Sequence, residues 1–369
     1  MSIKINNAEA IPLKIPFSIG FNKTAKSGGL DWPALEILLI KIESSEGIVG
    51  WGEIFNYSSQ FAAVSAFNSM IRPLILKRKI ESIPDFLMEL QKTIHIFGRY
   101  GIVMHCFSGL DIALYDIEAK QKKLPLYKHL NSNSKKTKLN GYASLYRYAD
   151  PEIVKDKCLE SIKYGYKYIK LHEINEQEVK AARDAIGDQI PLMLDVNCSW
   201  DYKSALNISK KLKKYNLYFL EEPIFPPEDF ETLFKLKSKI RIPLAAGENC
   251  YTAYQFNQMI KYKAIDYVQP SVTKVGGITE FIKIIKLTNK NKLKLMPHSP
   301  YFGPGWLANL HLITAFCPSA LVERLYVYEE ASLYKDSTTP AKGMFSVPDD
   351  IGLGLNPNLD VIKTYKVNY

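Results

Sequence analysis

The sequence predicts an α/β protein built on a closed parallel (β/α) barrel of the TIM type, and two observations point to this fold. Eight short apolar runs between residues 137 and 332 alternate with segments of helical periodicity, as repeated strand–helix–strand units of a parallel sheet do. The runs recur about every 25 residues, which suits one strand and one helix per unit of such a barrel. Because all strands of the barrel end at one mouth, residues at those ends are the first candidates for chemistry.

Each predicted barrel strand is short and apolar, and the gaps between strands carry apolar residues at helical spacing. The predicted strands are residues 139–143, 168–171, 192–195, 218–221, 243–248, 267–270, 294–298 and 320–323. The clearest predicted helices are residues 151–164, 177–186, 202–212 and 279–287. Residues 137–332 are therefore predicted to form the barrel domain.

The residues before the barrel predict an α+β domain. Strand-like runs at residues 3–5, 34–43 and 48–53 are followed by helical periodicity over residues 60–70, 84–97 and 101–121. A polar linker follows, so this domain is assigned to residues 1–131. Residues 333–369 lose the barrel pattern, and we expect this tail to pack back on the first domain.

A polar, glycine-rich stretch over residues 17–29 interrupts the strands of the first domain. Phe17 and Phe21 within it suit a mobile flap that closes over a ligand. A simple connector with no such role fits the composition equally well.

Composition narrows the function classes. Hydrophobic residues make up 47% and charged residues 23% of the chain, as in an ordinary soluble globular protein. No apolar run is long enough to span a membrane, so no membrane partner is expected. The net charge of +10 comes from dispersed lysines rather than a basic stripe, so nucleic acid is not expected as a partner either. The positive field suits a small anionic substrate. Five scattered cysteines suit reduced thiols, so we expect a cytoplasmic protein.

Three neighbouring predicted strands carry acids at their ends, namely Asp195, Glu221 and Glu248. Carboxylates that converge at a barrel mouth repel one another unless a cation lies among them. Oxygen ligands without Cys or His favour Mg²⁺, with Mn²⁺ as a second possibility. The alternative is three separate, solvated strand-end acids, but their common position favours a metal site.

Several longer motifs are spread over nearly the whole chain. They are Ser108-Gly-Leu-Asp-Ile-Ala-Leu-Tyr-Asp116, Leu124-Pro-Leu-Tyr127, Leu194-Asp-Val-Asn197, Leu220-Glu-Glu-Pro223, Ala246-Gly-Glu-Asn249, Val268-Gln-Pro270 and Gly276-Gly-Ile-Thr-Glu280. Together they resemble the enolase superfamily, and within it the mandelate racemase/muconate lactonizing enzyme family, in its mandelate racemase-like branch. The resemblance implies a modified (β/α)7β barrel with an α+β capping domain, and Mg²⁺ bound by Asp195, Glu221 and Glu248 but not by Glu222.

The resemblance also implies catalytic residues at four strand ends. Lys170-Leu-His172 stands where the family has two lysines on strand 2, so Lys170 is expected to stay charged and His172 to transfer a proton. On strand 7, His298 matches the catalytic histidine, and on strand 8, Glu323 matches the donor to the developing enediolate. The strand 6 aspartate that partners the histidine is Ser271 here.

Three further residues are predicted to bind substrate: Asn197, which follows the first metal ligand by two positions, Ser271, and Tyr142 in the first barrel strand. Because serine cannot stabilise imidazolium by charge, His298 is expected to be a weaker base than in the usual pair.

We therefore expect a Mg²⁺-dependent lyase that removes the proton α to a carboxylate, forms an enediolate and dehydrates a sugar acid to a 2-keto-3-deoxy acid. A racemase, epimerase or cycloisomerase would use the same enediolate and is the first alternative. A catalytically inactive ligand-binding barrel is the alternative from another class. We also expect a homo-oligomer.

Overall fold

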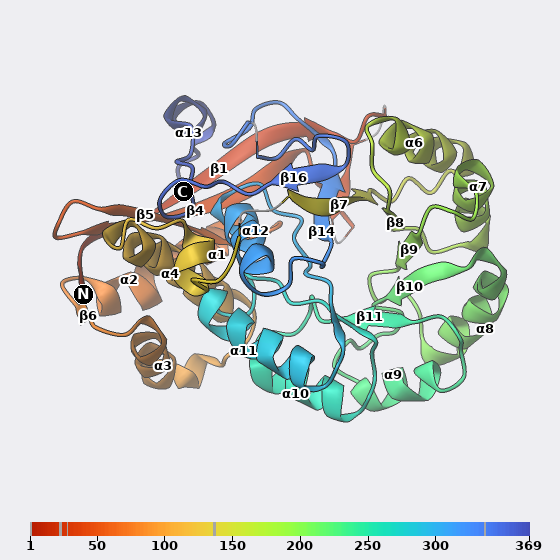
Figure 1. Ribbon diagram of the computed structural model, residues 1–369, viewed down its shortest axis with the longest axis horizontal. Coiled ribbons are helices and arrows are strands. Elements are labelled where there is room, and N and C mark those ends of the chain that lie inside the picture. Colours follow the sequence, from red (N-terminus) through yellow and green to blue (C-terminus); the bar gives the residue numbers. More distant parts are fainter. Residues whose placement is uncertain (1, 22–23, 28, 136–137, 336) are drawn as a thin grey trace.

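The computed structural model describes residues 2–21, 24–27, 29–135, 138–335 and 337–369. Figure 1 shows a barrel ringed by helices, with a smaller lobe beside it that carries the N-terminus. The two lobes meet where helix α4 of the smaller lobe packs against helices α11 and α12 of the barrel.

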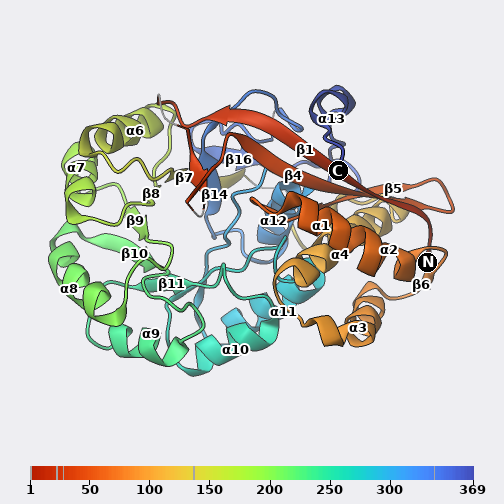
Figure 2. The ribbon, with the colours of Figure 1, turned by 180° about the vertical axis from the view of Figure 1, so that it is seen from behind.

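The smaller lobe is an α+β cap built on an antiparallel sheet of order β15-β1-β4-β5, with β6 paired to the start of β1. Figure 2 shows α1 and α4 against this sheet, and α4 packs on β4 and β5. The strands are β1 (Ile3–Ser18), β4 (Ala34–Ser44), β5 (Val49–Ile54), β6 (Lys79–Ile80) and β15 (Tyr328–Glu329). The helices are α1 (Gln60–Ala66), the π-helical turn η1 (Phe67–Ile71), α2 (Arg72–Ile75), α3 (Ile83–Thr93), the 3-10 turn η2 (His95–Phe97), α4 (Gly101–Gln121) and α5 (Leu126–Leu130).

The barrel has the predicted (β/α)7β arrangement within the described residues. Its parallel strands follow the order β13-β12-β11-β10-β9-β8-β7-β14, and a helix connects each strand to the next along the chain. The strands are β7 (Lys138–Leu145), β8 (Ile169–Leu171), β9 (Leu192–Asp195), β10 (Leu217–Glu221), β11 (Leu244–Ala246), β12 (Tyr267–Val268), β13 (Lys294–Leu295) and β14 (Val322–Tyr326). The helices are α6 (Pro151–Lys163), α7 (Glu176–Ile186), α8 (Tyr202–Leu212) with the turn η3 (Lys213–Tyr215), α9 (Phe230–Lys237), α10 (Ala253–Lys261), α11 (Gly277–Lys290) and α12 (Pro304–Phe316).

Local sequence explains where most of these helices begin. Asp150, Asp201, Asp229 and Thr252 each accept a backbone N–H of the following first turn, in α6, α8, α9 and α10 respectively. Such side-chain caps satisfy amides that have no partner inside the helix. None of the helices in the described ranges is both long and apolar enough to cross a membrane.

Helix α11 is capped from the other lobe instead. Asp111 of α4 accepts the amides of Ile278 (2.5 Å) and Thr279 (3.3 Å) and the Thr279 hydroxyl (2.5 Å). Gly277 has φ +83°, and a Cβ there would lie 2.3 Å from the Asp111 carboxylate, so only glycine leaves room for this contact. The predicted motifs around Asp111 and Gly277 thus fasten the cap to the barrel.

The tail contacts both lobes. Strand β16 (Met344–Ser346) pairs antiparallel with β7 of the barrel. Helix α13 (Leu359–Tyr365) then leads to the cap, where the Val367 amide donates to the Pro12 carbonyl at 3.0 Å. The apolar residues of β7 alone could not reveal a pairing with a segment about 200 residues away.

The segment predicted as a flap is partly strand. Phe17 and Ser18 end β1 and pair with β15, and the Phe17 ring packs on Trp32 with centroids 4.8 Å apart. A short hairpin of β2 (Lys26–Ser27) and β3 (Leu30–Asp31) follows. Residues 22–23 and 28 of the predicted flap lie outside the described residues.

Candidate active site

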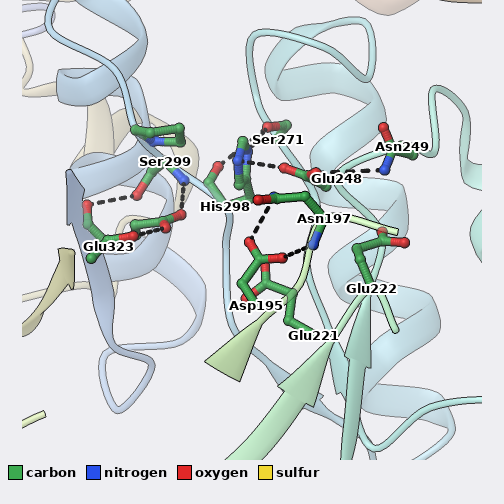
Figure 3. A network of polar contacts seen from close by, with 12 residues as sticks. Asp195, Asn197, Glu221, Glu222, Glu248, Asn249, Ser271, His298, Ser299 and Glu323 are labelled. Atoms are coloured by element: carbon green, nitrogen blue, oxygen red, sulfur yellow. Dashed lines mark hydrogen bonds and ion pairs between the residues drawn. The ribbon is translucent and has the colours of Figure 1, made fainter. Parts of the chain in front are cut away.

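The three predicted metal ligands lie together at the carboxyl ends of neighbouring strands. Asp195 ends β9 and Glu221 ends β10, and the two are direct partners across this strand pair. Glu248 follows β11 by two residues. Figure 3 shows Asp195 and Glu221 side by side, with Glu248 beside His298. The common end of the parallel strands therefore places these acids at one mouth, as in other barrels of this kind.

Lys170 lies among the carboxylates. Its Nζ is 2.7 Å from Glu323, 3.0 Å from Glu221 and 3.5 Å from Asp195, and its side chain is fully buried. Burial disfavours a charged lysine, but the charges of Glu221 and Glu323 outweigh it and raise the pKa of Lys170 well above its usual value. Lys170 is therefore a fixed positive charge.

His172 presents one nitrogen to the same cluster. Its Nδ1 lies 2.5 Å from the Leu145 carbonyl, which can only accept, so Nδ1 carries a proton. Nε2 then lies 3.3 Å from Asp195 Oδ2 and is the atom able to gain or lose a proton. This contact and the charge of Lys170 offset the effect of burial and lower the pKa of Asp195.

His298 is oriented by a pair of hydroxyls in place of a carboxylate. Its Nδ1 lies 2.6 Å from Ser271 Oγ, which in turn contacts the Tyr301 hydroxyl. The Tyr301 hydroxyl donates to the His298 carbonyl at 2.9 Å, which leaves its oxygen free to accept a hydrogen bond from the Ser271 hydroxyl. Ser271 Oγ can then accept a hydrogen bond from the N–H at His298 Nδ1. His298 Nε2 then donates to Glu248 at 2.7 Å. These partners suit an imidazolium, the form that can act as an acid.

The partners of His298 and Glu323 decide the charges of two carboxyl groups. Burial would raise the pKa of Glu248, but the charge and hydrogen bond of His298 hold it below its usual range. Burial would likewise raise the pKa of Glu323, but Lys170 and His298 lower it to about 2. Ser299 also donates its amide to Glu323 at 2.9 Å and its hydroxyl to the Glu323 carbonyl at 3.1 Å, which links the ends of the β13 and β14 segments. With its pKa lowered, Glu323 accepts these hydrogen bonds, and its role as donor to the developing enediolate stays a prediction.

The donor set fits a divalent cation. Glu221 Oε1 is buried without a hydrogen-bond partner, and burial and the nearby charge of Asp195 raise the pKa of Glu221 although Lys170 lies beside it. A cation bound by Asp195, Glu221 and Glu248 would satisfy this oxygen. Across the described ranges, however, no three His, Cys, Asp or Glu side chains are already gathered around one metal position. Instead, the carboxylates contact the nitrogen atoms of Lys170, His172 and His298.

Glu222 lies outside this cluster, as expected from strand geometry. Figure 3 shows its side chain directed away from Asp195 and Glu221. It accepts the Gly247 amide at 3.0 Å and contacts Cys198 Sγ at 3.5 Å. Burial raises the pKa of Glu222 to about 7. Burial and Glu222 also raise the pKa of the Cys198 thiol, so this cysteine is not an activated nucleophile.

Of the three predicted substrate-binding residues, only Asn197 reaches the mouth. Its amide group donates to Asp195 Oδ2 at 3.1 Å and its oxygen accepts from Arg147 at 3.2 Å. Arg147, which we did not predict, also donates to the His172 carbonyl at 2.5 Å. It lies two residues beyond β7, so its strand-end position was the available signal.

Ser271 and Tyr142 are both fully buried. Ser271 lies behind His298, and its hydroxyl is hydrogen-bonded to Nδ1 of that histidine. Tyr142 is fully buried in the barrel interior with Met193 and Phe219, and its ring lies 5.7 Å from Lys170 Nζ. Tyr142 points inward because alternate residues of a barrel strand face the interior, and large side chains fill it.

Comparisons with known proteins agree with this geometry. Residues 154–361 match the family model described as enolase C-terminal domain-like, and residues 31–130 match the N-terminal domain of mandelate racemase/muconate lactonizing enzyme. The chain belongs to this family. The predicted resemblance to the enolase superfamily is thus confirmed, as is the barrel with an N-terminal capping domain.

Relatives of this enolase-superfamily protein include sugar-acid dehydratases. The chain is 30% identical over 348 residues to the arabinonate dehydratase of Saccharolobus solfataricus, with 92% of each chain covered. It is 30% identical over 315 residues to the L-talarate/galactarate dehydratase of Salmonella typhimurium, covering 83% of this chain and 76% of that one. A racemase from Streptomyces coelicolor A3(2) with bound magnesium has the same fold, with a TM-score of 0.85, 22% identity and coverage of 98% and 100%.

Proposed function

We propose that the protein dehydrates a sugar acid: it removes the proton α to the carboxylate and eliminates the β-hydroxyl, which yields a 2-keto-3-deoxy acid. The arrangement of the two histidines carries this proposal. In the sheet, β8 and β13 lie on either side of the strands that end in the acids, so His172 and His298 approach the mouth from opposite flanks. Each is fixed through Nδ1 and presents Nε2 to the carboxylate cluster.

Two further observations support the proposal. The relatives reported above carry the names of dehydratases that act on arabinonate and on L-talarate or galactarate. The net charge of +10 suits attraction of an anionic sugar acid.

We assign Asp195, Glu221 and Glu248 as the residues that would hold Mg²⁺, and Mn²⁺ would suit the same oxygen ligands. When bound, the ion supplies positive charge that stabilises the carboxylate as its α-proton becomes acidic.

The protein's own residues perform the proton transfers. His172 Nε2, whose tautomer is set by the Leu145 carbonyl, removes the α-proton and becomes imidazolium. Lys170, positive and buried, donates to the oxygen on which charge develops, while Glu323 holds Lys170 at 2.7 Å. His298 gives its Nε2 proton to the β-hydroxyl, which leaves as water.

A racemase, epimerase or cycloisomerase is the second candidate, because the same pair of histidines can serve both faces of one α-carbon. In that case His298 would return a proton to the α-carbon rather than to a leaving hydroxyl.

Two variants assayed in deuterated water separate the steps and the candidates. His298→Asn should stop keto-acid formation but retain exchange of the α-proton, because His172 still forms the enediolate. His172→Asn should lose both. If His298→Asn also stops exchange while His172→Asn retains it, the roles are reversed. Isomerised substrate with no keto acid from the wild type would identify the second candidate. A Mg²⁺-loaded wild type that neither exchanges nor converts any sugar acid would indicate the inactive barrel.

A further inference from the structure

A lysine at the junction of cap and barrel is buried without an ion-pair partner among the described residues. Lys274, in the loop between β12 and α11, is only 5% exposed. Its Nζ faces the rings of Phe55 (4.8 Å to the centroid) and Tyr251 (6.0 Å). Within the described ranges its ammonium has no hydrogen bond or ion pair. Aromatic faces attract a cation but leave its N–H donors unsatisfied, so an enclosed ammonium here lacks an acceptor.

His105 of the cap helix α4 lies in the same cluster with two unused nitrogens. It is 6% exposed, and neither ring nitrogen has a hydrogen-bond partner. Its ring meets Phe55 edge-on and Tyr251 at a tilt, with centroids 5.3 and 5.6 Å apart. The backbone at Phe55 lies near the ring and favours its protonated form. Burial and the charge of Lys274 lower the pKa of His105 to about 3, so the ring is neutral and offers one donor and one acceptor.

The cluster is next to the proposed catalytic residues. Lys274 follows Ser271 by three residues, and its amide donates to the Ser271 carbonyl at 2.9 Å. Its charge also helps to lower the pKa of Glu248, although Glu248 itself is bonded to His298. Lys274 therefore lies near enough to Glu248 for its charge to act on that carboxylate.

We propose that Lys274 and His105 form a subsite for a second carboxylate at the far end of the substrate, so that the preferred substrates are sugar diacids (aldarates) rather than aldonates. This inference rests on the proposed function for the position of the first carboxylate. A carboxylate has two acceptor oxygens, which can take hydrogen bonds from both the ammonium and the imidazole N–H. The uncharged terminal hydroxymethyl group of an aldonate offers the lysine no charge.

Equilibrium binding tests the subsite without turnover. Calorimetry on the Mg²⁺-loaded His172→Asn protein would compare aldarate and aldonate pairs that differ only at the terminal carbon, such as galactarate with galactonate and glucarate with gluconate. We expect the aldarate of at least one pair to bind about 10-fold more tightly or better. Adding Lys274→Met should weaken aldarate binding about 10- to 100-fold, the range of a charged hydrogen bond, and aldonate binding less than about threefold.

Three controls accompany this test. Lys274→Arg keeps the charge and should retain most of the preference. Lys286→Met, an exposed lysine on α11, should change nothing. His105→Phe keeps the aromatic packing and should reduce the preference in the same direction, which provides a second variant if Lys274→Met fails to fold.

The outcomes separate this inference from the proposed dehydration. Equal affinity for both members of every pair, or no binding of any, overturns the subsite. Loss of Mg²⁺ affinity together with equal weakening of both members also overturns it, because Lys274 would then act only through Glu248. Keto-acid formation from aldonates would leave dehydration intact in each case. A Lys274-dependent preference for aldarates in the binding test, together with a wild type that forms no keto acid from any sugar acid, would support the subsite and refute dehydration.

Discussion

Each predicted metal ligand forms an ion-pair contact with a nitrogen-bearing side chain. Asp195 contacts His172, Glu221 contacts Lys170, and Glu248 contacts His298. Glu221 is the least satisfied of the three, since one of its buried oxygens has no partner. Metal binding must compete with these contacts, so it should depend on the charge of each acid. The adjacent Glu222 is equally buried but faces Gly247, which makes it a matched control.

We expect Glu221→Gln to weaken Mg²⁺ binding by more than about 100-fold, because the substitution removes the charge of a metal ligand. This loss exceeds the usual effect of replacing a residue that does not itself bind the metal. Glu222→Gln should retain Mg²⁺ affinity within about 10-fold. Calorimetric titration with Mg²⁺ and circular dichroism of both variants provide the measurement. Normal Mg²⁺ affinity in a folded Glu221→Gln protein would refute the metal assignment.

Ser271→Ala tests the hydroxyl pair that orients His298. Loss of one hydrogen bond to Nδ1 should lower kcat about 5- to 10-fold while KM stays unchanged, because Ser271 lies behind His298 and away from the substrate. Ser209→Ala is the control, since Ser209 is also buried and its hydroxyl has no partner. A rise in KM with constant kcat would instead indicate that Ser271 contacts the substrate.

At the scale of elements, helix α11 depends on a cap from another lobe. Its own N-cap residue, Gly276, has no side chain to accept the first amides, and Asp111 of α4 accepts them instead. Ser108 of α4 adds a hydrogen bond from the Gly276 amide at 2.8 Å. The loop that leads into α11 contains both Ser271 and Lys274, so this contact ties the cap helix to the proposed site.

Asp111→Ala should destabilise the protein by about 1–3 kcal/mol, because it leaves buried donors on Ile278 and Thr279 unpaired. Asp111→Asn should cost less, since its amide oxygen can still accept. Hydrogen exchange should increase in the first turn of α11 in the Ala variant. Ser82→Ala, which removes the cap of α3 within the cap lobe, should leave α11 protected. Exchange in α11 that is unchanged by Asp111→Ala would contradict the capping role.

At the scale of the whole molecule, one buried histidine joins three distant segments. His311 of α12 accepts the Tyr127 amide at Nδ1 (3.2 Å) and donates from Nε2 to the Leu353 carbonyl (3.1 Å). These partners require the neutral ring, because a proton on Nδ1 would face the Tyr127 N–H. Burial lowers the pKa of His311 to about 4.

This histidine should make stability depend on pH. An unfolded histidine has a pKa of about 6.5. Below that pH the unfolded state therefore binds a proton that folded His311 does not bind until the pH falls much lower. Its contribution to stability is therefore complete above pH ~6.5 and is lost as pH falls toward 4, at up to about 1.4 kcal/mol per pH unit. His311→Gln should reduce the slope of unfolding free energy against pH by one proton in this window. Denaturant unfolding at several pH values measures it, and an unchanged slope would refute the assignment.

Two predictions about the whole chain remain open to experiment. Limited proteolysis would test whether residues 1–131 with 333–369 and residues 137–332 behave as separate domains. Sedimentation analysis would test the expected homo-oligomer.

The architecture and the position of the acids could be predicted from local sequence patterns. Strand and helix periodicity is local, and parallel strands must end on one side, so the assignment of Asp195, Glu221 and Glu248 to one mouth needed no tertiary information. The helix starts at Asp150 and Thr252 also depend on local sequence, because each side chain accepts a hydrogen bond from the first turn of the helix that follows it.

Which side chains are partners could not be predicted from the sequence, because it depends on the folded arrangement. The contact of Lys170 with Glu323 and the Ser271–Tyr301 pair behind His298 join residues from different strands or loops, and their hydrogen bonds depend on side-chain rotamers that no periodicity encodes. The same is true of Lys274 and His105, which come from different lobes. Periodicity reports which face of an element is buried, whereas the charge and the proton on a buried group depend on the neighbours that folding brings to it.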